Sequence, residues 1–339
     1  MKAQTSITQS APAKARRALL GMAAAAMLAG GASLPVRAQD AASYPSRMIR
    51  ITVPNPAGGT SDVLGRLLAK ELGEMFKQPV IVENKAGGNG QIGAAFVAKS
   101  APDGYNLLLL DMSVLTIGPS VVAQLPYNPQ KDLAPITIPA YSPHLLVVRN
   151  DLPVKNIDEL AAYAKKSGKP PSFGTPLASI SQLAGILIAQ DRGFEFNVIG
   201  YKGGAQALAD LAGGQIDSAM ASVVATNQLV QGGKVKAIAV TSAKPFAATP
   251  GVPTVASQIP NFVTGSWQGL LAPANTPPAV LDKLQDAVQR IVTRPEFAKH
   301  LQELGSEPSA MNRQQIAEWM RTETQRWGKV VKDNNIKAE

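Results

Sequence analysis

The stretch that decides the fold is Pro54-Asn55-Pro56-Ala57-Gly58-Gly59-Thr60-Ser61-Asp62. It follows the apolar run at residues 48–53 and precedes residues 63–70, whose apolar positions recur at helical spacing. Prolines stop a strand, glycines permit torsions that other residues avoid, and Thr, Ser or Asp can cap a helix, so the pattern predicts a strand-to-helix turn. Such a turn aims unpaired backbone N–H groups and a helix dipole at one point, which favours a small anion. The alternative is an ordinary βα loop.

Short apolar runs then alternate with helical patterns along the chain, which is typical of βαβ units and a largely parallel sheet. Further strands are expected at residues 79–82, 105–110, 136–138, 145–148, 172–175, 196–199, 215–220, 235–241 and 267–271. Helices are expected at residues 91–99, 156–166, 179–189, 205–211, 278–292, 295–304 and 313–332. Residues 139–144 are interpreted as a crossover between domains.

This order predicts two α/β lobes with a cleft between them. Each lobe is expected to be a mostly parallel sheet flanked by helices. The first lobe comprises residues 44–142 and, because the strand at 267–271 is expected to return to it, residues 246–339. The second lobe comprises residues 143–245.

The first 38 residues have the features of a secretory signal peptide. A basic start ending in Arg16 and Arg17 precedes the small and apolar residues 18–34, and Ala38 completes a small-x-small cleavage site. The apolar part is short and rich in Ala and Gly for a membrane span. We expect cleavage near Ala38 and a periplasmic protein. An uncleaved N-terminal anchor is the alternative, and the paired arginines give little support for twin-arginine export.

Charge and cysteine content exclude several classes of function. The signal segment holds five of the 33 basic and none of the 24 acidic residues, so its removal lowers the formal net charge from +9 to +4. That charge is too mild to argue for nucleic acid as a partner, although it favours anionic solutes slightly. The chain has no cysteine, which excludes disulfides, thiolate metal sites and cysteine nucleophiles.

A Gly-x-Gly-x-x-Gly pattern occurs at Gly88, Gly90 and Gly93, with Asp111 eighteen residues beyond it. It is similar to a dinucleotide-binding fingerprint, but its glycines do not follow the strand directly and it lies in the second βα unit. We therefore expect a glycine turn that opens a helix, and no cofactor. The remaining alternative is an exported oxidoreductase that holds a dinucleotide there.

Two more turns offer backbone N–H groups at helix starts. One is residues 201–205, where Lys202 precedes two glycines, and the other is the hydroxyl-rich segment at residues 174–182. We expect both to converge with the first turn on a single cleft, although a simple loop with a solvated lysine is an alternative for the former.

Catalysis has no clear basis in the sequence. His144 and His300 are the only histidines, no Gly-x-Ser-x-Gly elbow is present, and no paired carboxylates or metal-ligand spacing stand out. Asp217 is expected to be a structural hydrogen-bond acceptor. Trp267 could form the floor of a pocket or pack in the core. We expect no catalytic residues and no metal.

The order of these pieces resembles the extracytoplasmic solute receptors of tripartite tricarboxylate transporters, the Bug-type family. Segments that carry the resemblance are residues 44–53, 56–62, 78–85, 101–105, 125–127, 201–204, 211–217, 239–244, 252–255, 269–273 and 327–331. They span nearly the whole chain after the signal segment. The resemblance implies a two-lobed periplasmic-binding fold of type II with a hinge, which closes on a small solute and delivers it to an integral membrane permease. A sensor that signals to a membrane kinase is the alternative.

Many relatives hold carboxylates through backbone N–H groups and water. Carried onto this chain, the resemblance and the turns above give a set of expected ligand-binding residues: Ala57, Gly58, Gly59, Thr60, Ser61, Asp62, Asp111, Ser113, Thr175, Ser179, Ser181, Gln182, Lys202, Ala221 and Trp267. We expect the protein to act as a monomer.

Departures from the family pattern bear on the ligand. Asn55 stands where relatives often have Phe, Asp111 where a small hydroxyl residue is common, and Ala221 where Asp is frequent. Asp111 would repel a second carboxylate and favour an amine or amide, whereas Ala221 would weaken recognition of an amine. The ligand is therefore predicted to be a small monocarboxylate, or a neutral polar or aromatic acid derivative, and not a tricarboxylate.

Overall fold

The computed structural model describes residues 43–337. The predicted signal peptide and its cleavage site lie outside the described residues. Strand pairing runs in the order β2-β1-β3-β9-β4-β7-β5-β6, and β8 and β10 also pair with β4. Strand β4 (Leu133–Arg149) takes part in two sections of the sheet, because its first half pairs with β9 and its second half with β7. The change of partner falls between Pro143 and His144.

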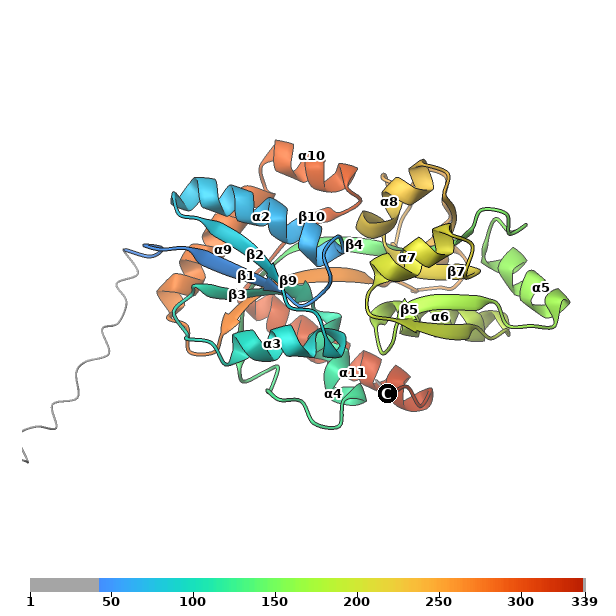
Figure 1. The fold of residues 1–339 in the computed structure, drawn as a ribbon, viewed down its shortest axis with the longest axis horizontal. Helices are drawn as coiled ribbons and strands as arrows, with labels where there is room; N and C mark the ends of the chain where they lie inside the picture. The colour runs from blue at the N-terminus through green and yellow to red at the C-terminus, as the bar shows by residue number, and fades with distance from the viewer. Residues whose placement is uncertain (1–42, 338–339) are drawn as a thin grey trace, which may run out of the picture. The chain divides into compact units, whose positions relative to one another are not determined.

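The first section holds the early strands and the late ones. Its strands are β1 (Ile49–Val53), β2 (Val80–Asn84), β3 (Asn106–Asp111), β9 (Gly265–Pro273) and β10 (Glu307–Met311). Its helices are α2 (Thr60–Phe76), α3 (Gln91–Ala98), α4 (Ser113–Val121), α9 (Pro278–Val292), α10 (Pro295–Glu303) and α11 (Arg313–Asp333), with the 3₁₀ turn η1 (Gly88–Gly90). Helices α2 and α9 pack on one face and α3, α4 and α11 on the other, so both faces are covered (Figure 1).

The second section holds the middle of the chain. Its strands are β5 (Ser172–Pro176), β6 (Asn197–Tyr201), β7 (Ser218–Ser222) and β8 (Val235–Val240). Its helices are α5 (Ile157–Ser167), α6 (Ile180–Arg192), α7 (Gly204–Ala212) and α8 (Val223–Gln231), followed by the 3₁₀ turn η2 (Val255–Ser257). Helices α5 and α6 enclose one apolar core and α7 and α8 another, on opposite faces of these strands.

The α/β class and the order of most elements are as predicted, but the expectation of a mostly parallel sheet is wrong. The sheet is mixed and not mostly parallel, since four strand pairs among the described residues are parallel and five antiparallel. Residues 139–144 do carry the chain from one section of the sheet to the other, as expected, but they do so within continuous strand β4 and not as a break between two strands. A register shift between Thr137 and Ala140 accommodates Pro139. Helices α4 and α8 and strand β10 were not anticipated.

Candidate functional site

A cavity of about 140 Å³ lies between the two sections of the sheet. The first turns of α2, α4, α6, α7 and α8 all contribute to its wall, as does Gln91 at the start of α3. None of the described residues that line it is Lys or Arg. Helix N-termini expose amide groups without intrahelical acceptors and carry partial positive charge, so the wall attracts an anion without any cationic side chain.

The turn after β1 supplies Asn55, Pro56, Gly59, Thr60 and Ser61 to the wall. Gly59 precedes α2 in an extended conformation, and Val63 is the first amide to donate back to it, at 3.0 Å. The amides of Thr60 and Ser61 therefore have no acceptor within the helix.

Asp62 holds this turn in place from behind the cavity wall. Its carboxylate accepts hydrogen bonds from Gly58 N at 2.9 Å, Asn84 Nδ2 at 3.0 Å and two nitrogens of Arg66 at 2.8 and 3.1 Å. Burial alone would raise the pKa of Asp62, but the hydrogen bonds from Arg66, Gly58 and Asn84 lower it below its usual value. Asp62 is thus ionised at neutral pH and shapes the loop that lines the cavity.

The turn before α6 has a similar internal brace. Ser179 caps α6 by accepting from Gln182 N, and its hydroxyl donates to Pro176 O at 2.6 Å. Gln182 Oε1 accepts from Ala178 N at 2.5 Å, where Ala178 has a φ of 52°. Of this turn, Pro176, Ala178, Ser179, Ile180 and Ser181 line the cavity.

The turn after β6 and the start of α8 complete the side formed by the second section. Gly203, Gly204, Ala205 and Gln206 line the cavity at the N-terminus of α7. A Cβ at Gly203 would lie 3.4 Å from Pro56 Cδ, so the turns of the two sections approach closely there. Ser222 caps α8, and its hydroxyl shares a hydrogen bond with that of Thr60 across the cavity. The predicted convergence of three turns on one site is therefore confirmed.

One part of the wall is formed by polar side chains from the sheet and from the start of α4. Asp111 at the end of β3, Ser113 at the start of α4, His144 of β4, and Ser266 and Gln268 of β9 all line it. Burial raises the pKa of Asp111, against hydrogen bonds from Ser266 and Ser113. Burial lowers the pKa of His144 to about 4, so its imidazole is neutral at pH 7. Its Nδ1 is buried and has no hydrogen-bond partner among the described residues.

The structure brings some of the predicted site residues together at the cavity and leaves others outside its wall. The predicted residues that line it are Gly59, Thr60, Ser61, Asp111, Ser113, Ser179, Ser181 and Ala221. Those that do not are Ala57, Gly58, Asp62, Thr175, Gln182, Lys202 and Trp267. Thr175 is buried behind the α6 turn, and Lys202 is exposed to solvent.

Trp267 packs in the core, 4.4 Å from the ring of Tyr141 and 5.7 Å from that of Trp319. Its neighbours Ser266 and Gln268 line the cavity instead, because successive side chains of a strand point to opposite faces. The main wall residues outside the expected ligand-binding set are Asn89, Gln91, His144, Ser222, Ser266 and Gln268. Strand alternation could have indicated Ser266 and Gln268, and the cap preference of serine could have indicated Ser222.

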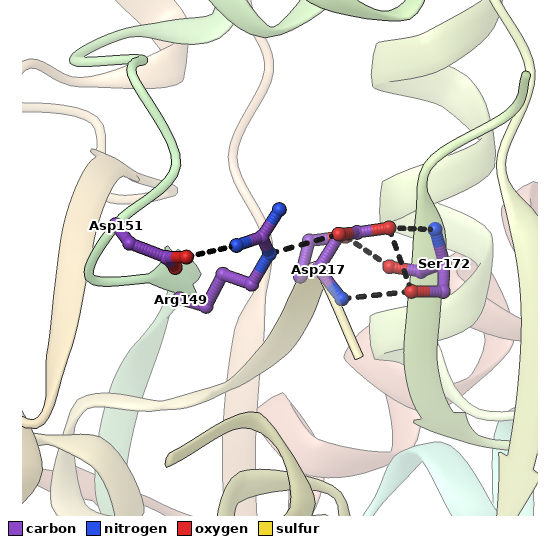
Figure 2. A network of polar contacts seen from close by, with 5 residues as sticks. Arg149, Asp151, Ser172 and Asp217 are labelled. Atoms are coloured by element: carbon purple, nitrogen blue, oxygen red, sulfur yellow. Dashed lines mark hydrogen bonds and ion pairs between the residues drawn. The ribbon is translucent and has the colours of Figure 1, made fainter. Parts of the chain in front are cut away.

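Other motifs have structural roles. Gly93 packs so closely on the first turn that a Cβ there would lie 2.7 Å from Pro54 Cβ, which accounts for this glycine of the Gly-x-Gly-x-x-Gly pattern. Asp217 is a hydrogen-bond acceptor, as predicted: it accepts from Arg149 and from the backbone and hydroxyl of Ser172 (Figure 2), and it does not line the cavity. Within residues 43–337, no three His, Asp or Glu side chains are grouped to hold a metal ion. No helix in that range is long and apolar enough to cross a membrane.

Comparison with known proteins gives consistent matches. The family described as tripartite tricarboxylate transporter family receptor matches residues 64–336. The protein BugT of Bordetella pertussis is 32% identical over 312 residues, covering 91% of this chain and 95% of that protein. The structure of R. palustris Rpa4515 with adipate has a TM-score of 0.83 at 32% identity, over 87% of this chain and 99% of that one. The periplasmic binding protein BugD has a TM-score of 0.81 at 33% identity, with the same coverage.

Proposed function

Because this chain belongs to the receptor family of tripartite tricarboxylate transporters, we propose that it is a periplasmic receptor that closes around one small organic acid and delivers it to an integral membrane permease. The Bug-type resemblance found in the sequence is confirmed by the same matches. The receptor performs no chemistry of its own and acts as a monomer. It is exported by the N-terminal signal segment, which is cleaved near Ala38.

The proposal that the ligand is an organic acid rests on one observation. Five helix N-termini meet at a cavity whose described lining contains no Lys or Arg. A carboxylate accepts hydrogen bonds from several such amides at once, whereas a cation would face their partial positive charge. The adipate bound to Rpa4515 is a carboxylate of this kind in a relative.

Closure requires that the ligand contact both lobes, because only differential contact shifts an open–closed equilibrium. We place the lobes at residues 44–142 with 246–339, and at residues 143–245. The change of strand partner between Pro143 and His144 supports this boundary. The turns at Gly59 and at Ser179 would then grip the carboxylate from opposite sides.

The test begins with ligand identification. Mass spectrometry of small molecules released from protein purified without denaturation should give an organic acid, and calorimetric titration should return a Kd in the micromolar range or tighter, about 8 kcal/mol of binding free energy. Tight binding of citrate without binding of any monocarboxylate or amide would contradict the proposed ligand class.

A variant tests the role of the first turn. A Cβ at Gly59 meets only Pro56 O, at 3.6 Å, so Gly59→Val is compatible with the fold. The side chain should obstruct the amides of the α2 N-terminus and lower affinity by at least 100-fold, measured by calorimetry. Gly73→Val is the matched control, since Gly73 lies near the other end of α2 with ordinary contacts of 3.5 Å. Equal affinity in the two variants would remove this turn from the site.

A further inference from the structure

We infer, on the basis of the proposed function, that Asp111, Ser266 and Gln268 form a second subsite of the cavity that selects a solute by an N–H donor remote from its carboxylate. The group selected is an ammonium or a primary amide, and a second carboxylate is rejected. These three side chains are called the acceptor subsite below.

The acceptor subsite is built by two strands of the first section. Asp111 ends β3, and Ser266 and Gln268 lie two residues apart on the same face of β9. Gln268 Nε2 lies 2.5 Å from Ser266 Oγ, and Ser266 Oγ lies 2.5 Å from Asp111 Oδ2. The other carboxylate oxygen of Asp111 accepts from Ser113 N at 2.9 Å.

The direction of these hydrogen bonds fixes the orientation of the glutamine amide. Ser266 Oγ donates its single proton to Asp111 Oδ2. Ser266 Oγ therefore accepts from its other neighbour, which must be the NH₂ group of Gln268. The carbonyl oxygen of Gln268, Oε1, therefore makes no hydrogen bond to Ser266.

Gln268 Oε1 has no hydrogen-bond partner among the described residues, although the Gln268 side chain is 0% exposed and lines the cavity. A buried carbonyl oxygen without a donor is unfavourable, and a donor on the solute would satisfy it. The unpaired oxygen of Gln268 and the carboxyl of Asp111 both favour a hydrogen-bond donor on the solute, and an N–H group can supply it.

The charges around the acceptor subsite exclude a second carboxylate. No Lys or Arg is found in the described lining, and the neighbouring His144 is neutral. A second carboxylate at this end would face the oxygens of Asp111 and Gln268 with no cation to compensate, which is costly in a buried site. An ammonium would pair with Asp111, and an amide NH₂ would donate to both oxygens.

The test is a panel of acids that differ only at one end. At four carbons the panel is succinate, succinamate, 4-aminobutanoate and butanoate, and at five carbons it is glutarate, glutaramate, 5-aminopentanoate and pentanoate. We expect the amide or the ammonium compound of one length to bind the wild-type protein at least 10-fold more tightly than its dicarboxylate and its alkyl counterparts, by calorimetry. A dicarboxylate that binds as tightly as both N–H compounds overturns the inference.

Asp111→Asn gives a second measurement. The inference predicts a gain in affinity for one ligand, which a misfolded variant would not show. The new amide would donate to a carboxylate, so the variant should gain at least 10-fold in affinity for the dicarboxylate while losing affinity for the ammonium compound. Asp286→Asn is the matched control, because Asp286 is exposed on α9, and it should leave all affinities unchanged. Unchanged preference in Asp111→Asn also overturns the inference.

The outcomes separate this inference from the function on which it rests. If wild-type protein binds carboxylates but prefers a dicarboxylate, the inference fails and the receptor function stands. If it binds no carboxylate of either panel and releases none on denaturation, the proposed function fails and the inference with it.

Discussion

His144 is a neutral imidazole enclosed where β4 passes from one section of the sheet to the other. It is 3% exposed, and its backbone is held on both sides by Thr241. Because burial lowers its pKa from 6.5 to about 4, the unfolded chain binds a proton at this residue more readily than the folded chain between those pH values. Acidification through this window therefore removes stability, and the loss is complete below about pH 4.

The expected loss from this histidine is roughly 3 kcal/mol, at about 1.4 kcal/mol per pH unit. Urea unfolding of the ligand-free protein from pH 7 to pH 4 should show it as a difference between wild type and His144→Gln. The variant should gain stability relative to wild type as the pH falls through 6.5 toward 4. If the difference in unfolding free energy between wild type and His144→Gln did not change with pH, the pKa of His144 would be the same in the folded and the unfolded protein.

At the level of single residues, backbone roles were easier to predict from the sequence than side-chain directions. Glycine indicates a turn through the torsions it permits, and serine indicates a helix cap through its local hydrogen bond. The sequence therefore predicted Gly59 and Ser179 at positions where they do line the cavity. Trp267 was given a binding role that its neighbours Ser266 and Gln268 are better placed to perform, because one residue of offset in a strand reverses the face. Asp62 and Gln182 support the turns from behind, which no local pattern distinguishes from direct contact.

Helix α3 positions the ligand-facing turn by close contact at Gly93. A Cβ there would lie 2.7 Å from Pro54 Cβ, 3.0 Å from Pro54 Cα and 3.0 Å from Lys85 O. Two of these atoms are backbone, so relief requires that the helix or the turn shift. Gly93→Ala should therefore destabilise the protein by about 1–3 kcal/mol and also weaken ligand binding. Thermal unfolding and calorimetry of the same samples measure the two effects.

Gly73→Ala in α2 is the matched control, since its Cβ would make only ordinary contacts at 3.5 Å. It should be neutral or stabilising by up to about 1 kcal/mol, because alanine favours a helix over glycine. If Gly93→Ala behaved in the same way, α3 would not determine the position of the first turn.

Among whole elements, helices with clear caps were predicted well and the long strand was not. Helix α5 follows Asn156, which accepts from Glu159 N, and α9 runs from Pro278 to Val292 as its periodicity indicates. Strand β4 contains Pro135, Pro139 and Pro143, which argue locally for a break. Register shifts between Pro135 and Ala140 accommodate the missing donors of Pro135 and Pro139, and pairing with residues 70 or more positions away decides the outcome. Such long-range pairing is not visible in local sequence.

For the whole molecule, the cavity depends on contacts that join its two sides directly. The hydroxyls of Thr60 and Ser222 share a hydrogen bond, and Asn89 Nδ2 donates to Leu177 O at 2.9 Å. The periodicity of the chain predicted two groups of elements and a cleft, but not which side chains span it. Those pairs are 162 and 88 residues apart, and they come together only through the fold.

Asn89 offers the clearest test of closure, because its side chain can be removed while its backbone keeps the same conformation. Its φ of 50° is a value that favours Asn and Gly, so Asn89→Gly deletes the hydrogen bond to Leu177 and keeps the turn. One neutral hydrogen bond contributes about 0.5–1.5 kcal/mol, and its loss weakens the closed state by that amount. Ligand affinity should fall by about 2- to 10-fold, mainly through faster dissociation in stopped-flow experiments.

Asn275→Gly is the matched control. Asn275 has a φ of 64° and does not line the cavity, so this variant carries the same gain in chain flexibility and should bind like wild type. Equal dissociation rates in the two variants would mean that the contact between Asn89 and Leu177 contributes nothing to holding the ligand, and that closure depends on the ligand's own bonds to the two sides.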